Sequence, residues 1–246
     1  MLRFCFVILI SIPYILFYIG KAVYIEHHPK RYTEKDRYHI AVSCIRIMQR
    51  HGRIHTKAYG TEHLPATGGY VMFANHQGKY DALGIMTSHQ KPCTVVIDEQ
   101  RSHLPIADQF ITLIQGTRLD KSTARTQVKG ILNVISEVAE GRRYIIFPEG
   151  GYYHNRNKVH EFSPGSFQCA IKSQSPIIPV ALIDSYKPFE LNSLRSVTTQ
   201  VHFLPPIYYE EYKDMSTKEV AVLTRKKIVD AIEHAQKANY GYVHVF

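Results

Sequence analysis

Residues Asn75-His76-Gln77-Gly78-Lys79-Tyr80-Asp81 place a histidine five positions before an aspartate, directly after an apolar run. A histidine takes a proton from a hydroxyl when a carboxylate holds its other ring nitrogen. On a regular helix five residues turn by about 500°, which leaves the two side chains about 140° apart. The chain must therefore bend between them. We expect the bend at Gly78, followed by a helix from near Lys79 that brings Asp81 to His76.

A second histidine has the same spacing to an aspartate. His103 and Asp108 belong to the segment HLPIAD, in which Pro105 precedes the apolar residues of a helix. Proline is common at the first position of a helix, so this segment is typical of a helix start. We interpret His103 and Asp108 as a structural pair.

Two further polar groups follow apolar runs. Arg118 comes after Ile-Thr-Leu-Ile-Gln-Gly-Thr, and Glu149-Gly150 comes after Tyr-Ile-Ile-Phe-Pro. In α/β sheets ligands bind beyond the carboxyl ends of strands, so we expect these groups to meet His76 there. A guanidinium suits a phosphate or a carboxylate, whereas Glu149 suits a hydroxyl or an organising cation. Taken separately, Arg118 could cap the sheet surface, and residues 147–150 could form a turn.

These side chains need strands and helices to position them. Short apolar runs predict strands at 70–74, 93–97, 111–114, 143–147, 177–183 and 199–204. A stripe at helical spacing predicts a helix over 122–140, and a capping box at 216–219 opens another that runs to about residue 238. Residues 61–69 read as a loop that opens the catalytic domain. The alternation predicts an α/β fold with a mixed, largely parallel sheet flanked by helices.

Composition narrows the class of protein. The 246 residues include 30 Lys+Arg against 21 Asp+Glu, a formal net charge of +9 that favours anionic partners. The four cysteines form no C-x-x-C pair and the 14 histidines form no metal-binding motif, so we predict neither a disulfide framework nor a metal site. No phosphate-cradling loop precedes Gly78-Lys79, and no nucleic-acid-reading element is present, so we predict no nucleic-acid partner.

The amino end has the strongest bias. Residues 4–20 carry no charge and lie between Arg3 and Lys21. As a helix they reach roughly 26 Å, slightly less than a hydrocarbon core, so they could span a membrane or lie embedded near one face. A cleaved signal peptide is the alternative, but no small-residue cleavage site follows. Basic residues downstream place the main domain on the cytoplasmic face of the cell membrane. We expect a membrane anchor and an amphipathic helical region at 1–58 and a catalytic domain at 59–246.

Four blocks together resemble the glycerolipid acyltransferase family, of the 1-acyl-sn-glycerol-3-phosphate acyltransferase type. Residues 75–81 match its N-H-x-x-x-x-D block, Arg118 the arginine that ends the second block, Phe147-Pro148-Glu149-Gly150 the third, and Ser175-Pro176-Ile177-Ile178-Pro179-Val180 the fourth. The similarity covers roughly residues 59–206. It implies that a fatty acyl group is transferred from a thioester of CoA or acyl carrier protein to a lysophospholipid hydroxyl, without a metal, a cofactor or a covalent acyl-enzyme.

The resemblance also implies residue roles. His76 and Asp81 would be catalytic, with His76 as the general base and Asp81 as the carboxylate that orients it. Substrate would be bound by Arg118, Glu149, Gly150 and Lys79. Val180 would lie towards the acyl chain.

One departure from the family concerns the third block. Family members usually continue Glu-Gly with a small residue and an arginine, whereas this chain has Gly151-Tyr152. Arg156, Lys158, Lys79 or Lys121 could supply the missing positive charge. Alternatively, the acceptor is another lysolipid. A more distant hypothesis is a non-catalytic basic protein that binds membrane surfaces.

Overall fold

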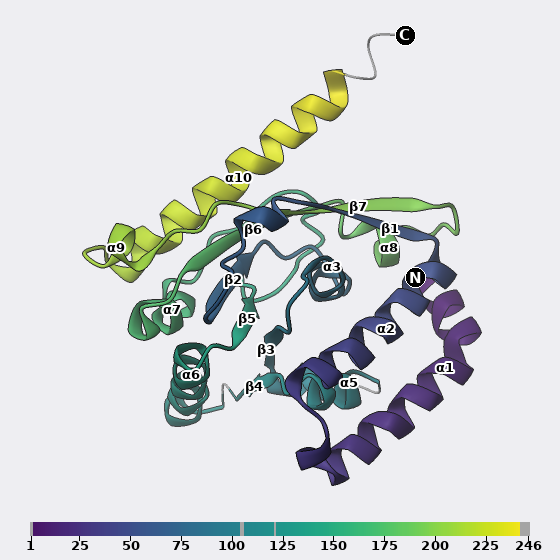
Figure 1. Ribbon diagram of the computed structural model, residues 1–246. Coiled ribbons are helices and arrows are strands. Elements are labelled where there is room, and N and C mark those ends of the chain that lie inside the picture. The colour runs from purple at the N-terminus through teal and green to yellow at the C-terminus, as the bar shows by residue number, and fades with distance from the viewer. Residues whose placement is uncertain (1, 104–105, 121, 242–246) are drawn as a thin grey trace.

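The computed structural model describes residues 2–103, 106–120 and 122–241, which form one mixed sheet covered by helices (Figure 1). The sheet has the strand order β1-β7-β6-β2-β5-β3-β4. Neighbouring strands are parallel except β6 and β7, which are antiparallel. The predicted mixed, largely parallel sheet is therefore confirmed. Its strands are β1 Ile54–Tyr59, β2 Tyr70–Ala74, β3 Thr94–Asp98, β4 Thr117–Leu119, β5 Arg143–Ile146, β6 Ile177–Ile183 and β7 Val197–Phe203.

The central strands are buried on both faces. All five residues of β2 and all seven of β6 are buried. Because successive side chains of a strand point to opposite faces, Met72 lies in one apolar cluster and Phe73 in the other. Continuous apolar runs of this kind are typical of parallel strands that are covered on both sides.

Helices cover each face of the sheet. On one face lie α1 Leu2–His27, α2 Glu34–Gly52, α3 Asp81–Ser88 and α5 Ala107–Leu113. On the other lie α6 Ala124–Ala139, α7 Gln168–Ser173 and α10 Thr217–Gly241. Figure 1 shows α1 and α2 as neighbours on the side of the sheet away from α10. The short helices are η1 Pro29–Arg31, η2 Thr61–His63, α4 Glu99–Ser102, η3 Pro164–Phe167, α8 Lys187–Glu190 and α9 Tyr209–Tyr212.

Most predicted elements are confirmed, with two differences among the strands. The strand predicted at 111–114 is wrong, because these residues end α5 and its C-terminal cap, and the strand in this part of the chain is β4. A short apolar run does not distinguish a buried helix from a strand. Strand β1 was not predicted, because only its first residue is buried and it has no apolar alternation. It lies at the edge of the sheet, beside β7.

The amino-terminal region forms a helical hairpin. α1 is longer than the uncharged run and continues through Pro13. α2 begins after Thr33, whose hydroxyl accepts from the amide of Asp36 at 3.2 Å, while the Asp36 carboxylate accepts from the amide of Thr33 at 2.9 Å. α2 packs on the domain through Tyr38, Ala41 and Ile45. The division of the chain at residue 58 remains an interpretation.

Candidate active site

His76 and Asp81 form the hydrogen-bonded pair that their spacing predicts. Nδ1 of His76 lies 2.7 Å from Oδ2 of Asp81. Because an ionised carboxylate only accepts hydrogen bonds, Nδ1 carries a proton, and in the neutral imidazole the lone pair is on Nε2. Nε2 has no hydrogen-bond partner in the part of the chain that the structure describes. The His76 side chain is 17% exposed and that of Asp81 is fully buried. The imidazole therefore presents a basic nitrogen to a partly open site.

A hydrogen-bonded turn produces the bend between them. The amide of Asp81 donates to the carbonyl of Gly78 at 3.3 Å. Oδ2 of Asp81 accepts from the amides of Gln77 at 2.5 Å and Gly78 at 2.9 Å. Gly78 is not in the left-handed region, and α3 begins at Asp81 itself. The bend is thus at the expected place, but the aspartate and the turn make it, rather than the conformational freedom of glycine.

Glu149 joins the loop after β5 to the loop after β2. Its Oε1 accepts from the amide of His76 at 2.8 Å, and its Oε2 accepts from the amide of His160 at 3.1 Å and from Nδ2 of Asn155 at 3.3 Å. Burial raises the pKa of Glu149, and the hydrogen bonds from the two amides oppose that shift. Both carboxylate oxygens are therefore engaged within the protein, and one of them holds the backbone of the candidate base.

A network of side-chain amides connects the loop after β2 to the end of β6 and to the loop that follows it. Asn75 pairs with the backbone of Leu182 through bonds of 3.0 and 2.7 Å. The side-chain Nε2 of Gln77 donates to the carbonyl of Leu182 at 2.7 Å and to Oδ1 of Asn157 at 3.0 Å. Asn157 in turn accepts from the amide of Asp184 at 2.9 Å and donates to its carboxylate at 3.1 Å. Three neighbouring strand ends are thus joined around His76.

Two aromatic rings enclose the imidazole. The Phe147 ring is stacked on His76 with centroids 4.3 Å apart, and the Tyr152 ring meets its edge at 4.9 Å. Tyr152 is the residue that stands where the family usually has arginine. It therefore contacts the candidate base directly.

Three of the seven described non-glycine residues with positive φ lie in the same loops. His154, Arg156 and Asp184 have φ values of 54°, 52° and 60°, in the left-handed region, and Gly150 has φ 73°. Non-glycine residues rarely adopt this region, and such residues cluster at functional sites. For Gly150 the conformation explains the residue type.

The structure does not bring Arg118 to the same loops. Arg118 lies in the edge strand β4, separated from β2 by β5 and β3, which corresponds to about 14 Å between strand axes. Its guanidinium donates to the carboxylate of Asp108 at 2.9 Å, to Thr112 at 2.8 Å and to Ser102 at 3.1 Å. His103 lies 3.3 Å from the same carboxylate. The expected meeting of three strand ends therefore holds for His76 and Glu149 only.

The remaining predicted residues lie in different surroundings. Lys79 is exposed, and its Nζ lies 4.9 Å from the ring centroid of Phe4 in α1. Arg156 is exposed and lies over the Tyr186 ring at 5.7 Å. Val180 is fully buried in the core. Lys121 and Pro105 lie outside the described residues.

Sequence reasoning missed Gln77, Asn157 and Asp184. Gln77 lies inside the first block, at a position where the block accepts any residue, and the other two follow later strands without a recognisable spacing. Their connection exists only through the sheet, in which β6 and β5 both lie beside β2. Among the described residues no group of three or more His, Cys, Asp and Glu side chains could hold a metal ion.

Known proteins similar to this chain include lipid acyltransferases. 1-acyl-sn-glycerol-3-phosphate acyltransferase alpha of Mus musculus is 30% identical over 182 residues, which are 69% of this chain and 62% of that protein. The Escherichia coli (strain K12) 1-acyl-sn-glycerol-3-phosphate acyltransferase is 28% identical over 172 residues, 69% of each chain. The chain thus spans less than two thirds of the mouse relative's length.

A solved structure has the same fold. The crystal structure of the 1-acyl-sn-glycerophosphate (LPA) acyltransferase PlsC from Thermotoga maritima superposes with a TM-score of 0.78, at 19% identity, over 96% of this chain and 95% of that one. At this identity the likeness bears on the fold alone. The model of the family described as Acyltransferase matches residues 55–183, more than half of the chain and all four blocks. This protein therefore belongs to the acyltransferase family.

Proposed function

We propose that the protein transfers a fatty acyl group from a thioester of CoA or acyl carrier protein to the hydroxyl of 1-acyl-sn-glycerol-3-phosphate, giving phosphatidate. The mouse and E. coli relatives are named for that acceptor. The observation that carries the proposal is the His76–Asp81 pair, in which the carboxylate holds Nδ1 and leaves Nε2 available.

In the proposed reaction His76 is the general base. Nε2 takes the proton of the acceptor hydroxyl while that oxygen attacks the thioester carbonyl, and Asp81 stabilises the imidazolium that forms. The carbon–sulfur bond then breaks, the acyl ester is released, and the thiolate takes the proton back from Nε2. The proposed reaction needs no metal, cofactor or covalent acyl-enzyme, as the family resemblance implies. Glu149 positions the His76 backbone, and together with Gly150 it shapes the acceptor site.

For the acceptor phosphate we propose Lys79 and Arg156. Lys79 follows His76 by three residues, and Arg156 precedes Asn157, which is bonded to Gln77. Both cations are exposed, whereas the guanidinium of Arg118 is paired with Asp108. A phosphate accepts hydrogen bonds from several directions, so cations on separate loops can bind it. Arg118 would join them only after releasing Asp108.

Tyr152 supports a second candidate, which is the same chemistry on another lysolipid. A phenol in contact with His76 replaces the usual guanidinium and adds no charge. An acceptor whose phosphate carries a further group would need less positive charge there. An acceptor panel that compares lysophosphatidate with lysophosphatidylglycerol and lysophosphatidylcholine, with thiol release as the readout, separates the two candidates.

We also propose that the protein is associated with a membrane through α1. Within the described residues α1 is the one helix long and apolar enough to cross a bilayer, with a mean hydropathy of 2.2 over its best window. Large apolar side chains such as Leu9, Leu16 and Phe17 are more than 60% exposed on it. Apolar surface of this extent on a helix is typical of contact with lipid or a partner.

The packing of α1 favours an embedded helix over a spanning one. Its first turn is joined to the domain by Arg3, which is fully buried and donates to the carbonyls of Lys187 at 3.2 Å and Pro188 at 3.3 Å. Its other end returns through η1 to the start of α2, where Glu34 pairs with Arg142 beside β5 at 3.1 Å. Both ends of α1 therefore lie against the same domain. We propose the cytoplasmic face for that domain from the basic residues that follow residue 20.

The decisive experiment is an acylation assay of purified membranes with both thioester donors. His76→Ala should abolish transfer to lysophosphatidate while the protein stays folded. Activity near wild type in this variant would refute the assigned base. Salt-sensitive vesicle binding without transfer from any donor would instead favour the non-catalytic membrane-binding protein.

A further inference from the structure

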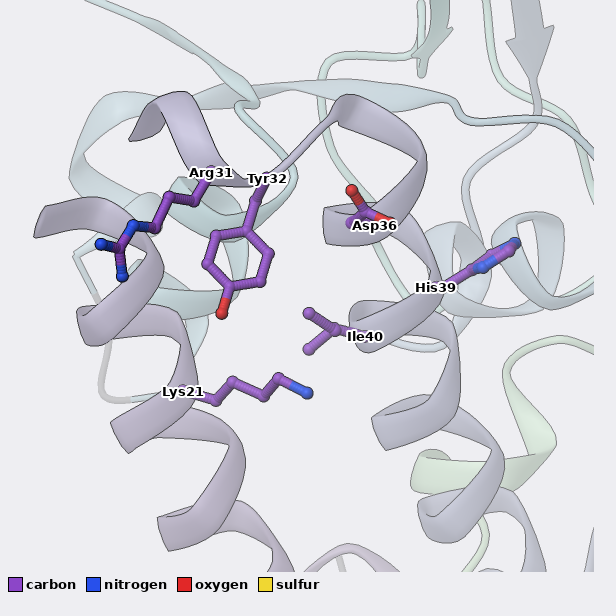
Figure 2. A pocket seen from close by; sticks show the side chains of 6 residues that line it. All are labelled: Lys21, Arg31, Tyr32, Asp36, His39 and Ile40. Carbon is purple, nitrogen blue, oxygen red and sulfur yellow. The ribbon is translucent and has the colours of Figure 1, made fainter. Parts of the chain in front are cut away.

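A groove lies between α1 and α2 near the connection of the hairpin, away from the His76 loops. Its volume is about 420 Å³, and Figure 2 shows the six side chains that line it. They come from the last turns of α1, from η1 and its C-terminal flank, and from the first two turns of α2. The lining residues are Lys21, Arg31, Tyr32, Asp36, His39 and Ile40.

The groove offers hydrogen-bond donors and an apolar wall. In Figure 2 the Lys21 ammonium and the Tyr32 hydroxyl point into the space between the helices, where Ile40 also lies. No described residue forms an ion pair or hydrogen bond with the Lys21 ammonium. The Arg31 guanidinium lies at the side of the groove, over α1, and donates to the Tyr24 hydroxyl at 3.3 Å. An ammonium, a guanidinium and a phenol together suit phosphate oxygens.

The lining also contains an acid. One oxygen of Asp36 is held by the amide and hydroxyl of Thr33, and these hydrogen bonds lower its pKa, so the carboxylate is charged at neutral pH. With Lys21 and Arg31 the lining carries a net charge of +1 when the histidine is neutral. His39 points away from the gap in Figure 2. This pattern suits a ligand that combines a phosphate with a hydrogen-bond donor for Asp36.

The place of the groove on α1 indicates where such a ligand comes from. Lys21 is the first charged residue after the uncharged run of residues 4–20. The outer side of that run exposes apolar side chains, including Leu16 and Phe17 at 63% each. If lipid covers this surface, Lys21 lies where the apolar surface ends, at the level of the headgroups.

We propose that this groove binds the headgroup of one bilayer phospholipid. The phosphodiester lies against Lys21, Arg31 and the Tyr32 hydroxyl, and a headgroup hydroxyl donates to Asp36. Phosphatidylglycerol, which has two such hydroxyls, fits the lining, whereas phosphatidylcholine has no donor. The site is distinct from the His76 site, and the proposal does not depend on the reaction proposed there.

The test is native mass spectrometry of the full chain in detergent micelles with added phosphatidylglycerol, phosphatidylcholine or inorganic phosphate. The wild type should retain one phosphatidylglycerol. The double variant Lys21→Gln/Arg31→Gln should bind it about 30-fold more weakly, since two basic side chains at a membrane surface contribute about 2 kcal/mol. Lys218→Gln/Lys226→Gln is the matched control, because it removes the same charge from exposed positions on α10 and should bind like wild type.

A third variant tests the hydroxyl of Tyr32. Tyr32→Phe removes only the hydroxyl and should weaken retention by a few fold, with unchanged circular dichroism. Retention of phosphatidylglycerol by the double variant at the wild-type level would overturn the proposal. So would equal retention of phosphatidylcholine, which would indicate unspecific packing on α1, or displacement of the lipid by inorganic phosphate, which would indicate a site for a soluble anion.

Discussion

Asp81→Asn tests the proposed chemistry most directly, because it removes the charge of the carboxylate and almost none of its volume. Oδ2 of Asp81 accepts a hydrogen bond from Nδ1 of His76 at 2.7 Å, and the Asp81 side chain is fully buried. An imidazolium and a carboxylate whose charges are centred about 4 Å apart attract each other by about 4 kcal/mol at an effective dielectric constant of about 20. If that attraction develops in the transition state, its loss lowers kcat by about a thousandfold.

The assay is thioester-dependent acylation at saturating acceptor, with kcat and KM determined separately. We expect kcat to fall and KM to change little, because Asp81 acts through His76 and does not touch the acceptor. Oδ1 of Asp81 is buried without a hydrogen-bond partner among the described residues, so the new amide costs about 1–3 kcal/mol of stability, and the assay is run well below Tm. His103→Ala is the control, since its pair has the same spacing but the side chain is 57% exposed. A kcat within tenfold of wild type for Asp81→Asn would contradict the reasoning.

Four other substitutions follow from the structure. Gly78→Ala should keep wild-type activity, because a Cβ there meets its nearest atom at 3.9 Å, whereas Gly150→Ala forces alanine into φ 73° and should cost about 1–2 kcal/mol in urea unfolding; equal effects of the two would contradict this. Glu149→Gln should lower Tm by several degrees. The NH2 group of the glutamine must face one of the two backbone N–H groups, of His76 or His160, that a carboxylate oxygen now accepts from, at a cost of about 1–3 kcal/mol. An unchanged Tm would contradict the role of Glu149 in joining the two loops. Burial lowers the pKa of His89 to about 4. As the pH falls below about 6.5, this histidine is therefore protonated in the unfolded state before it is in the folded state, and the free energy of unfolding should decline by about 1.4 kcal/mol per pH unit down to about pH 4. His89→Gln should remove that part of the pH dependence.

The catalytic pair could be predicted from the chain because its members are close in sequence. Five residues separate His76 from Asp81, and helix geometry requires a bend between them. The strand before them follows from a short apolar run, which is a local property, and the helix after them follows from the need to bring Asp81 back to His76. The helices at 34–52, 124–139 and 217–241 were predictable for the same reason, since their caps and apolar stripes are written in consecutive residues.

The edge of the sheet was harder to predict. β1 lacks an apolar alternation because it lies at an edge. Ile111 and Leu113 pack into the core from a helix, and because a buried helix and a buried strand have equally apolar residues, the sequence run does not distinguish them. Arg118 follows an apolar run as Glu149 does, yet the strand order separates it from β2 and places it beside Asp108. Strand order depends on which surfaces pack together, and no local spacing records it.

The sequence by itself determined the chemistry available to this protein: a histidine with an acid five residues later, an apolar amino end, and four blocks in order. Only the tertiary structure decided which groups act together. The amide bridge from Gln77 through Asn157 to Asp184, the double engagement of Glu149 and the attachment of both ends of α1 to one domain join residues far apart in the chain. The physical reason is that hydrogen bonds and packing depend on distance in space, whereas spacing in a sequence fixes distance only within a single element.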